Sequence, residues 1–169
     1  MSVPAASTTT GRAGRDALAL AGFVALCFAV AGLGGYWSSR GLGPWYDGLA
    51  KPAWTPPGWL FGPVWTALYL AMAVAAWLVW RRGPSPARQG SLVLFGVQLA
   101  LNLAWSGIFF ALRSPGPAFV EIAVLWVAIA ATIAAFARTS RPAAALLVPY
   151  LAWVTFASAL NFAIWRLNA

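Results

Sequence analysis

The side chains of this sequence that could do chemistry are aromatic rings and amides at helical spacing. Gln98, Asn102, Trp105 and Phe109 follow one another at intervals of four, three and four residues. At about 100° per residue these four share one face of a helix. Flat apolar rings with a few orienting polar groups are the usual lining of a small-molecule site. The spacing therefore predicts a helix face that binds a flat, apolar ligand.

Two further segments repeat the pattern. If the three faces meet, they line an apolar pocket with orienting hydroxyls and amides. Two plainer interpretations stay open, because aromatic stripes often only pack and amides often only link membrane helices by hydrogen bonds. The residues on the two additional faces are Trp65, Tyr69, Met72, Tyr150, Trp153, Ala157 and Asn161.

The residue types that are missing exclude several kinds of chemistry. The chain has no histidine, and Cys27 is its one cysteine. Histidine-ligated zinc, Ser-His-Asp catalysis and a disulfide framework are therefore excluded. Its three acidic residues, Asp16, Asp47 and Glu121, are too few for a carboxylate calcium cage. We expect no bound metal.

Glu121 is the one acidic residue expected within an apolar segment, and two interpretations of it stay open. An intramembrane carboxylate is a candidate functional group. A position near the start of a helix, where a negative charge complements the helix dipole, is the alternative.

The composition is typical of an integral membrane protein. Apolar residues make up 62% of the chain and charged residues 8%, against about 45–50% and about 25% in soluble domains. The net charge is +8, but the arginines form short groups between apolar runs rather than one basic patch, so no nucleic-acid partner is expected. A lipid bilayer is the expected environment.

The apolar runs predict an all-α fold, a bundle of five transmembrane helices in one domain. Residues 1–16 are expected to form a disordered tail, and the first apolar run is too long for a signal peptide. A loop rich in proline, glycine and aromatic residues is expected between Gly41 and Gly58. The predicted helices cover about residues 17–38, 59–81, 90–112, 118–137 and 143–166.

The charges between the helices predict the topology. Seven arginines fall on the N-terminal side and four cations on the other side, so the positive-inside rule places the N-terminus in the cytoplasm, with a bacterial inner membrane as the expected location. Five tryptophans near helix ends are interpreted as interface anchors. These are Trp37, Trp45, Trp59, Trp80 and Trp165.

A stripe of small residues lies opposite the aromatic face of the third helix. Such stripes let a second helix backbone approach closely in lipid, so we expect a homodimer contact here. The stripe comprises Gly96, Ala100, Ala104, Gly107 and Ala111.

Several motifs in a fixed order resemble the TspO/MBR family, which comprises bacterial tryptophan-rich sensory proteins and the mitochondrial translocator protein (the peripheral-type benzodiazepine receptor). They extend from about Tyr36 to Asn168. The motifs are residues 45–57 (WYDGLAKPAWTPP), 62–69 (GPVWTALY), 102–105 (NLAW), 109–110 (FF), 149–153 (PYLAW), 160–162 (LNF) and 165–166 (WR).

The resemblance implies a dimeric five-helix protein whose pocket is closed by the first loop and binds porphyrins or haem, sterols and benzodiazepine-type ligands, with no required cofactor. It places Trp54 and Pro56 in the lid. It assigns Trp65 and Trp153 to the light-dependent porphyrin degradation of some members. Pocket-lining positions implied by the resemblance are Tyr69, Asn102, Trp105, Ala157 and Leu160.

One departure concerns sterols. Phe162 stands where the cholesterol-recognition stretch of the family has a tyrosine, so sterol binding stays open. The lack of histidine favours porphyrin over haem, and Lys51 or Arg40 could bind the propionates. Three functional hypotheses follow: a tetrapyrrole sensor or translocator, a photo-oxidative porphyrin-degrading enzyme, and a scaffold whose aromatic residues only pack.

Overall fold

Five long helices make up most of the computed structural model, which describes residues 7–169. All five are long and apolar enough to cross a membrane, with mean hydropathies from 1.6 to 2.3. Within these residues no strand occurs, so the predicted all-α fold with five spans is confirmed. The long helices are α1 (Ser7–Gly41), α3 (Phe61–Trp80), α4 (Pro86–Ser106), α5 (Pro115–Thr139) and α6 (Arg141–Leu167).

Three short elements complete the part of the chain that the structure describes. The loop after α1 contains one helical turn, α2 (Pro44–Asp47), and the 3-10 turn η1 (Gly58–Leu60) leads into α3. A π-helical turn, η2 (Gly107–Ala111), continues α4. The predicted loop between residues 41 and 58 is therefore largely confirmed.

Prolines set the starts of the helices, because proline fits the first helical turn and is poorly tolerated further inside. Pro86 opens α4, and the hydroxyl of Ser85 caps it by accepting a 3.1 Å hydrogen bond from the backbone N–H of Arg88. The helix thus begins four residues before the predicted residue 90. Pro115 likewise opens α5 ahead of the predicted residue 118.

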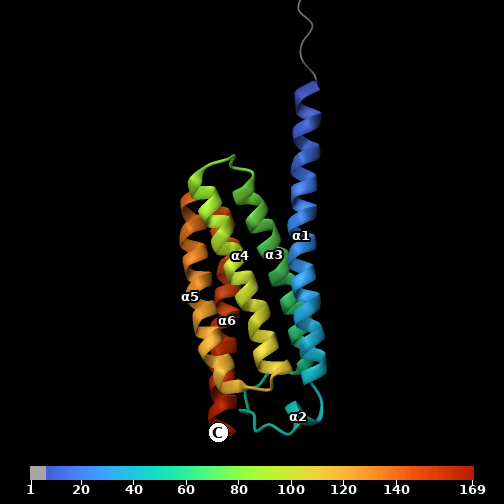
Figure 1. Ribbon diagram of the computed structural model, residues 1–169, viewed down its shortest axis with the longest axis vertical. Helices are drawn as coiled ribbons and strands as arrows, with labels where there is room; N and C mark the ends of the chain where they lie inside the picture. The colour runs from blue at the N-terminus through green and yellow to red at the C-terminus, as the bar shows by residue number, and fades with distance from the viewer. Residues whose placement is uncertain (1–6) are drawn as a thin grey trace, which may run out of the picture.

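The first helix begins earlier than the sequence predicts. It starts at Ser7 rather than at residue 17, so the expectation of a disordered tail is wrong for residues 7–16, while residues 1–6 lie outside the described part. At the end of this extension Asp16 pairs with Arg81, the residue that follows α3, at 3.0 Å, and the Asp16 carbonyl accepts a 2.9 Å hydrogen bond from the Trp77 indole. Figure 1 shows α1 projecting beyond the other helices.

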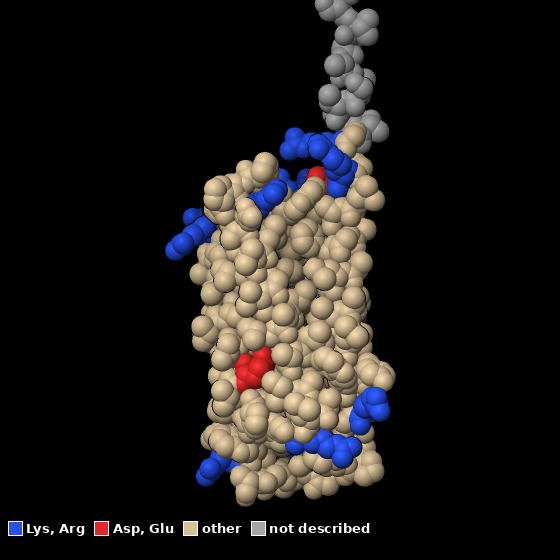
Figure 2. Space-filling model, viewed as in Figure 1, with Lys and Arg blue, Asp and Glu red and all other residues tan. Residues whose placement is uncertain are grey.

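The helices pack in a closed ring in the order α1, α3, α6, α5, α4, with α4 returning to α1. Large buried side chains fill the centre, among them Met72, Phe95, Phe136 and Tyr150. Charged side chains gather at the two ends of the long axis, and a largely uncharged band separates them (Figure 2). This distribution suits a bilayer, and the chain is an integral, multi-pass membrane protein.

Candidate functional site

A chain of buried hydrogen bonds joins α3, α4 and α6 at the centre of the bundle. The Tyr69 hydroxyl donates to the side-chain oxygen of Asn102 at 2.5 Å, and the Asn102 amide donates to the Tyr150 hydroxyl at 2.9 Å. The three residues are 5%, 3% and 0% exposed. Three predicted faces therefore meet here, and Asn102 bridges the helices.

An aromatic surface begins beside this chain and runs towards the loop. The Trp65 ring lies 5.7 Å from that of Tyr69 and 6.3 Å from that of Tyr150. Nearer the loop, Trp153 contacts Phe61 and Phe156 at centroid distances of 5.7 and 5.5 Å. We call Trp54, Phe61, Trp65, Trp153 and Phe156 the aromatic wall.

Trp54 attaches the loop to this wall. Its ring meets Phe156 edge-on at 5.8 Å, and about half of the side chain (51%) stays exposed. Pro56, the other predicted lid residue, is half-buried in the same loop. The lid role of Trp54 and Pro56 stays a prediction.

The indole N–H of Trp153 is buried and has no hydrogen-bond partner. An unpaired buried donor is costly, so native proteins rarely keep one without a reason. Trp105 differs, since its N–H donates to Asn161 at 3.0 Å, and Asn161 in turn donates to the carbonyl of Pro115 at 2.8 Å. Trp105 and Asn161 therefore link α4, α6 and α5.

The other predicted ligand residues lie around these groups. Phe109 stacks on Trp105 at 5.2 Å, and Leu160 is buried in the same cluster. Ala157 packs on the main core, half-buried. Gln98 is 1% exposed, with its amide nitrogen 3.9 Å from the Met72 sulfur and its carbonyl oxygen unpaired.

The loop is fastened to both ends of the site. Trp45 of α2 lies on Phe109 at 6.0 Å. Asn168, just beyond α6, accepts a 2.9 Å hydrogen bond from the N–H of Ala50 and donates one of 2.9 Å to its carbonyl. Sequence reasoning missed Asn168, which carries no periodic signal, as well as Phe61 and Phe156. Phe156 could have been found, because it follows Trp153 by three residues on the same helix.

The two cations proposed for the ligand carboxylates are engaged locally. The Lys51 ammonium donates to the carbonyls of Asp47 and Leu49 and lies 4.7 Å from the Tyr46 ring. Burial, assisted by the Asp47 charge, raises the pKa of Tyr46. Arg40 bonds the Tyr36 hydroxyl at 2.9 Å. Neither cation is directed at the aromatic wall in these contacts.

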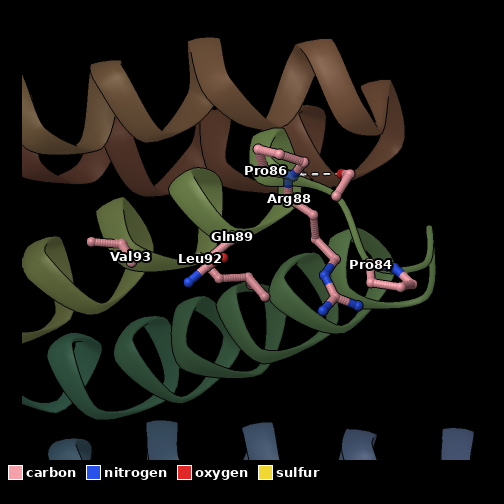
Figure 3. A pocket seen from close by; sticks show the side chains of 7 residues that line it. Pro84, Pro86, Arg88, Gln89, Leu92 and Val93 are labelled. Atoms are coloured by element: carbon pink, nitrogen blue, oxygen red, sulfur yellow. Dashed lines mark hydrogen bonds between the residues drawn. The ribbon is translucent and has the colours of Figure 1, made fainter.

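Two surface hollows lie at the opposite end of the bundle from the loop. Figure 3 shows one of about 570 Å³ at the turn between α3 and α4, lined by Pro84, Arg88, Leu92 and their neighbours. The other lies between α1 and the end of α3. Neither is lined by a residue of the predicted pocket. The rings of Phe61, Tyr69, Tyr150 and Phe156 lie within 6.3 Å of the indole of Trp65 or Trp153.

The small-residue stripe on α4 is only partly available to another chain. A side chain at Gly107 would meet the Trp37 ring of α1 at 3.2 Å, so its small size serves packing within the chain. Gly96, Ala100 and Ala111 are exposed and Ala104 is half-buried. Trp37 packs against η2 instead of serving only as an interface anchor. The homodimer stays a prediction.

Glu121 lies in the second turn of α5, and both carboxyl oxygens are buried without a hydrogen-bond partner. The helix dipole acts mainly within the first turn, so it explains the position of this carboxyl group poorly.

Among residues 7–169 no cluster of histidine, cysteine and acidic side chains could hold a metal.

Fold and site together define a multi-pass helical membrane protein with an aromatic site under a loop. Residues 23–166 match the TspO/MBR family, and the chain belongs to this family. It is 45% identical over 158 residues to the tryptophan-rich protein TspO of Chlorobaculum tepidum, covering 91% of this chain and 98% of the relative. It is also 47% identical over 126 residues to the human translocator protein (73% and 75%) and 39% over 131 residues to CrtK of Rhodobacter capsulatus (75% and 79%).

Proposed function

We propose that this protein binds a tetrapyrrole, a porphyrin in particular, at the aromatic wall and acts as a membrane sensor or translocator. The observation that carries the proposal is the unpaired, buried indole N–H of Trp153 among Phe61 and Phe156. A ligand acceptor at this position would satisfy the donor, and the surrounding rings offer flat apolar contact.

The residues present suit a porphyrin better than haem. The chain has no histidine, the commonest protein ligand of haem iron in globins and peroxidases. A porphyrin needs aromatic surface along its plane and polar groups at its edge, and the wall with Trp153 and Trp54 supplies both. The loop fastened by Asn168 would cover the bound molecule.

The names of relatives support the cellular role. Related proteins are called a tryptophan-rich sensory protein, in Cereibacter sphaeroides, and a translocator protein, in mammals. Both names fit a membrane protein that reports on or moves a small ligand. Sterol or benzodiazepine-type ligands would use the same apolar wall.

Titration with protoporphyrin IX, followed by the absorbance of the porphyrin in detergent micelles, tests the proposal. The Trp65→Phe/Trp153→Phe variant should bind at least tenfold more weakly than the wild type. A Trp59→Phe/Trp126→Phe variant loses the same number of indoles outside the wall and should bind normally. Equal affinity of the wall variant and the wild type would contradict the assignment.

A second candidate function is light-dependent degradation of the bound porphyrin. It is favoured by the contact of Trp65 with Tyr69 and Tyr150, which places three oxidisable rings side by side. Under illumination with dioxygen present, the protein should then convert porphyrin to a bilin-like product faster than detergent alone. The same rate in the Trp65→Phe/Trp153→Phe variant would show that these indoles are not the agents.

A further inference from the structure

A groove runs along the outer face of α1 where this helix meets the end of α3. It has a volume of about 480 Å³ and lies in the half of the bundle away from the loop. Apart from one arginine it is lined by apolar residues and glycine. The lining residues are Arg15, Leu18, Ala19, Gly22, Phe23, Leu26 and Trp80.

The length of the groove matches one leaflet of a bilayer. Arg15 and Leu26 are eleven residues apart on a continuous helix, which corresponds to about 16 Å at about 1.5 Å per residue. Half of the hydrocarbon core measures about 15 Å. An acyl chain lying in the groove would therefore place its headgroup at the level of Arg15, with Trp80 beside it in the usual interfacial position of tryptophan.

The positive charge at the end of the bundle away from the loop favours an anionic lipid headgroup. Seven arginines belong to it, namely Arg12, Arg15, Arg81, Arg82, Arg88, Arg138 and Arg141, and Asp16 is its one acidic residue. Asp16 already pairs with Arg81, the one ion pair among residues 7–169. Arg15 thus has no carboxylate partner within the described part, and a phosphate would meet an uncompensated positive field.

We propose that this groove binds one anionic phospholipid, with its phosphate at Arg15 and an acyl chain over Leu18, Gly22 and Leu26. A zwitterionic lipid fits less well, because the arginines repel its ammonium group. A second copy of this chain fits less well too, because a two-fold axis along the membrane normal would bring the same arginines together at one end.

Gly22 allows a test that leaves the fold intact. A Cβ atom added there meets no other side chain within 4 Å, so the side chain of Gly22→Leu starts in open space and extends into the groove. Gly32 lies further along α1, outside the groove, and has equally open space. Gly32→Leu is the matched control. Arg15→Gln removes the headgroup contact, and Arg138→Gln removes the same charge at the same end but on α5.

The experiment is native mass spectrometry of the purified full chain with an equimolar mixture of phosphatidylglycerol and phosphatidylcholine. The wild type should retain one phosphatidylglycerol selectively. Selectivity should fall about fivefold in Arg15→Gln, the factor for about 1 kcal/mol per arginine near an anionic lipid, and retention should be lost in Gly22→Leu. Both control variants should match the wild type.

Three results would overturn the proposal. The first is equal retention of both lipids by the wild type, and the second is unchanged retention in Arg15→Gln and Gly22→Leu. The third is a Gly22→Leu variant that forms a smaller oligomer than the wild type while its lipid retention stays the same, because the groove would then be a contact between subunits. Thermal unfolding close to that of the wild type is expected for all four variants.

Discussion

The hydroxyl of Tyr69 on α3 donates a 2.5 Å hydrogen bond to the side-chain oxygen of Asn102 on α4. The side-chain amide N–H of Asn102 in turn donates a hydrogen bond to the hydroxyl of Tyr150 on α6. One amide thus pairs two buried hydroxyls from different helices, and the indole of Trp65 lies against both tyrosines. The hydrogen-bonded centre of the bundle is therefore in direct contact with Trp65 of the aromatic wall.

Replacing Asn102 by leucine should destabilise the protein. The variant leaves two buried hydroxyls without their partner, which costs about 1–3 kcal/mol. Thermal unfolding in detergent micelles measures the loss. Tyr69→Phe and Tyr150→Phe each remove one bond and should cost less than Asn102→Leu. Wild-type stability of Asn102→Leu would show that the bonds do not hold the helices together.

The same substitution at two tryptophans should have different effects on stability. Trp105→Phe removes a 3.0 Å hydrogen bond and leaves Asn161 without its donor, so the unfolding temperature should fall. Trp153→Phe removes an unpaired donor, so the unfolding temperature of the ligand-free protein should be equal to the wild-type value or higher. A loss of stability in Trp153→Phe as large as that in Trp105→Phe would mean that the Trp153 indole has a partner.

Asn168→Ala should loosen the loop. Both hydrogen bonds to Ala50 are lost, so amide hydrogen exchange in residues 48–58 should speed up several-fold. Bound porphyrin should dissociate faster for the same reason. Leu167→Ala changes an exposed neighbouring side chain and serves as the control. Unchanged exchange in Asn168→Ala would leave the loop fastened by its aromatic contacts alone.

Glu121→Met should stabilise the protein, because a buried carboxyl group without a hydrogen-bond partner is replaced by an apolar side chain of similar size. The expected gain is about 1–3 kcal/mol in chemical unfolding. Glu121→Gln keeps a polar group at the site and should gain less. A destabilised Glu121→Met variant would mean that the carboxyl group makes a stabilising contact.

Helical periodicity was enough to predict which residues share a face on each of three helices, while the meeting of the faces was only a condition of the predicted pocket. Asn102, Tyr69 and Tyr150 lie on the faces predicted for them, because the helix fixes which side chains share a side. Periodicity does not fix how far neighbouring helices slide past one another. For this reason periodicity could not distinguish the indole N–H of Trp105, which donates a hydrogen bond to Asn161, from that of Trp153, which has no hydrogen-bond partner. The hydrogen bonds of Asn168 join residues 118 positions apart in the chain, so the local sequence carries no sign of them.

The most direct test of the aromatic wall as the ligand site follows the indole N–H signals of the 11 tryptophans by two-dimensional NMR of nitrogen-15-labelled protein in micelles. The Trp153 signal is assigned by its loss in Trp153→Phe, and the Trp105 signal likewise. On saturation with protoporphyrin IX, we expect a large downfield shift of the Trp153 signal as its N–H gains an acceptor, with a smaller change at Trp105. A Trp153 signal that stays in place while porphyrin is bound would contradict it.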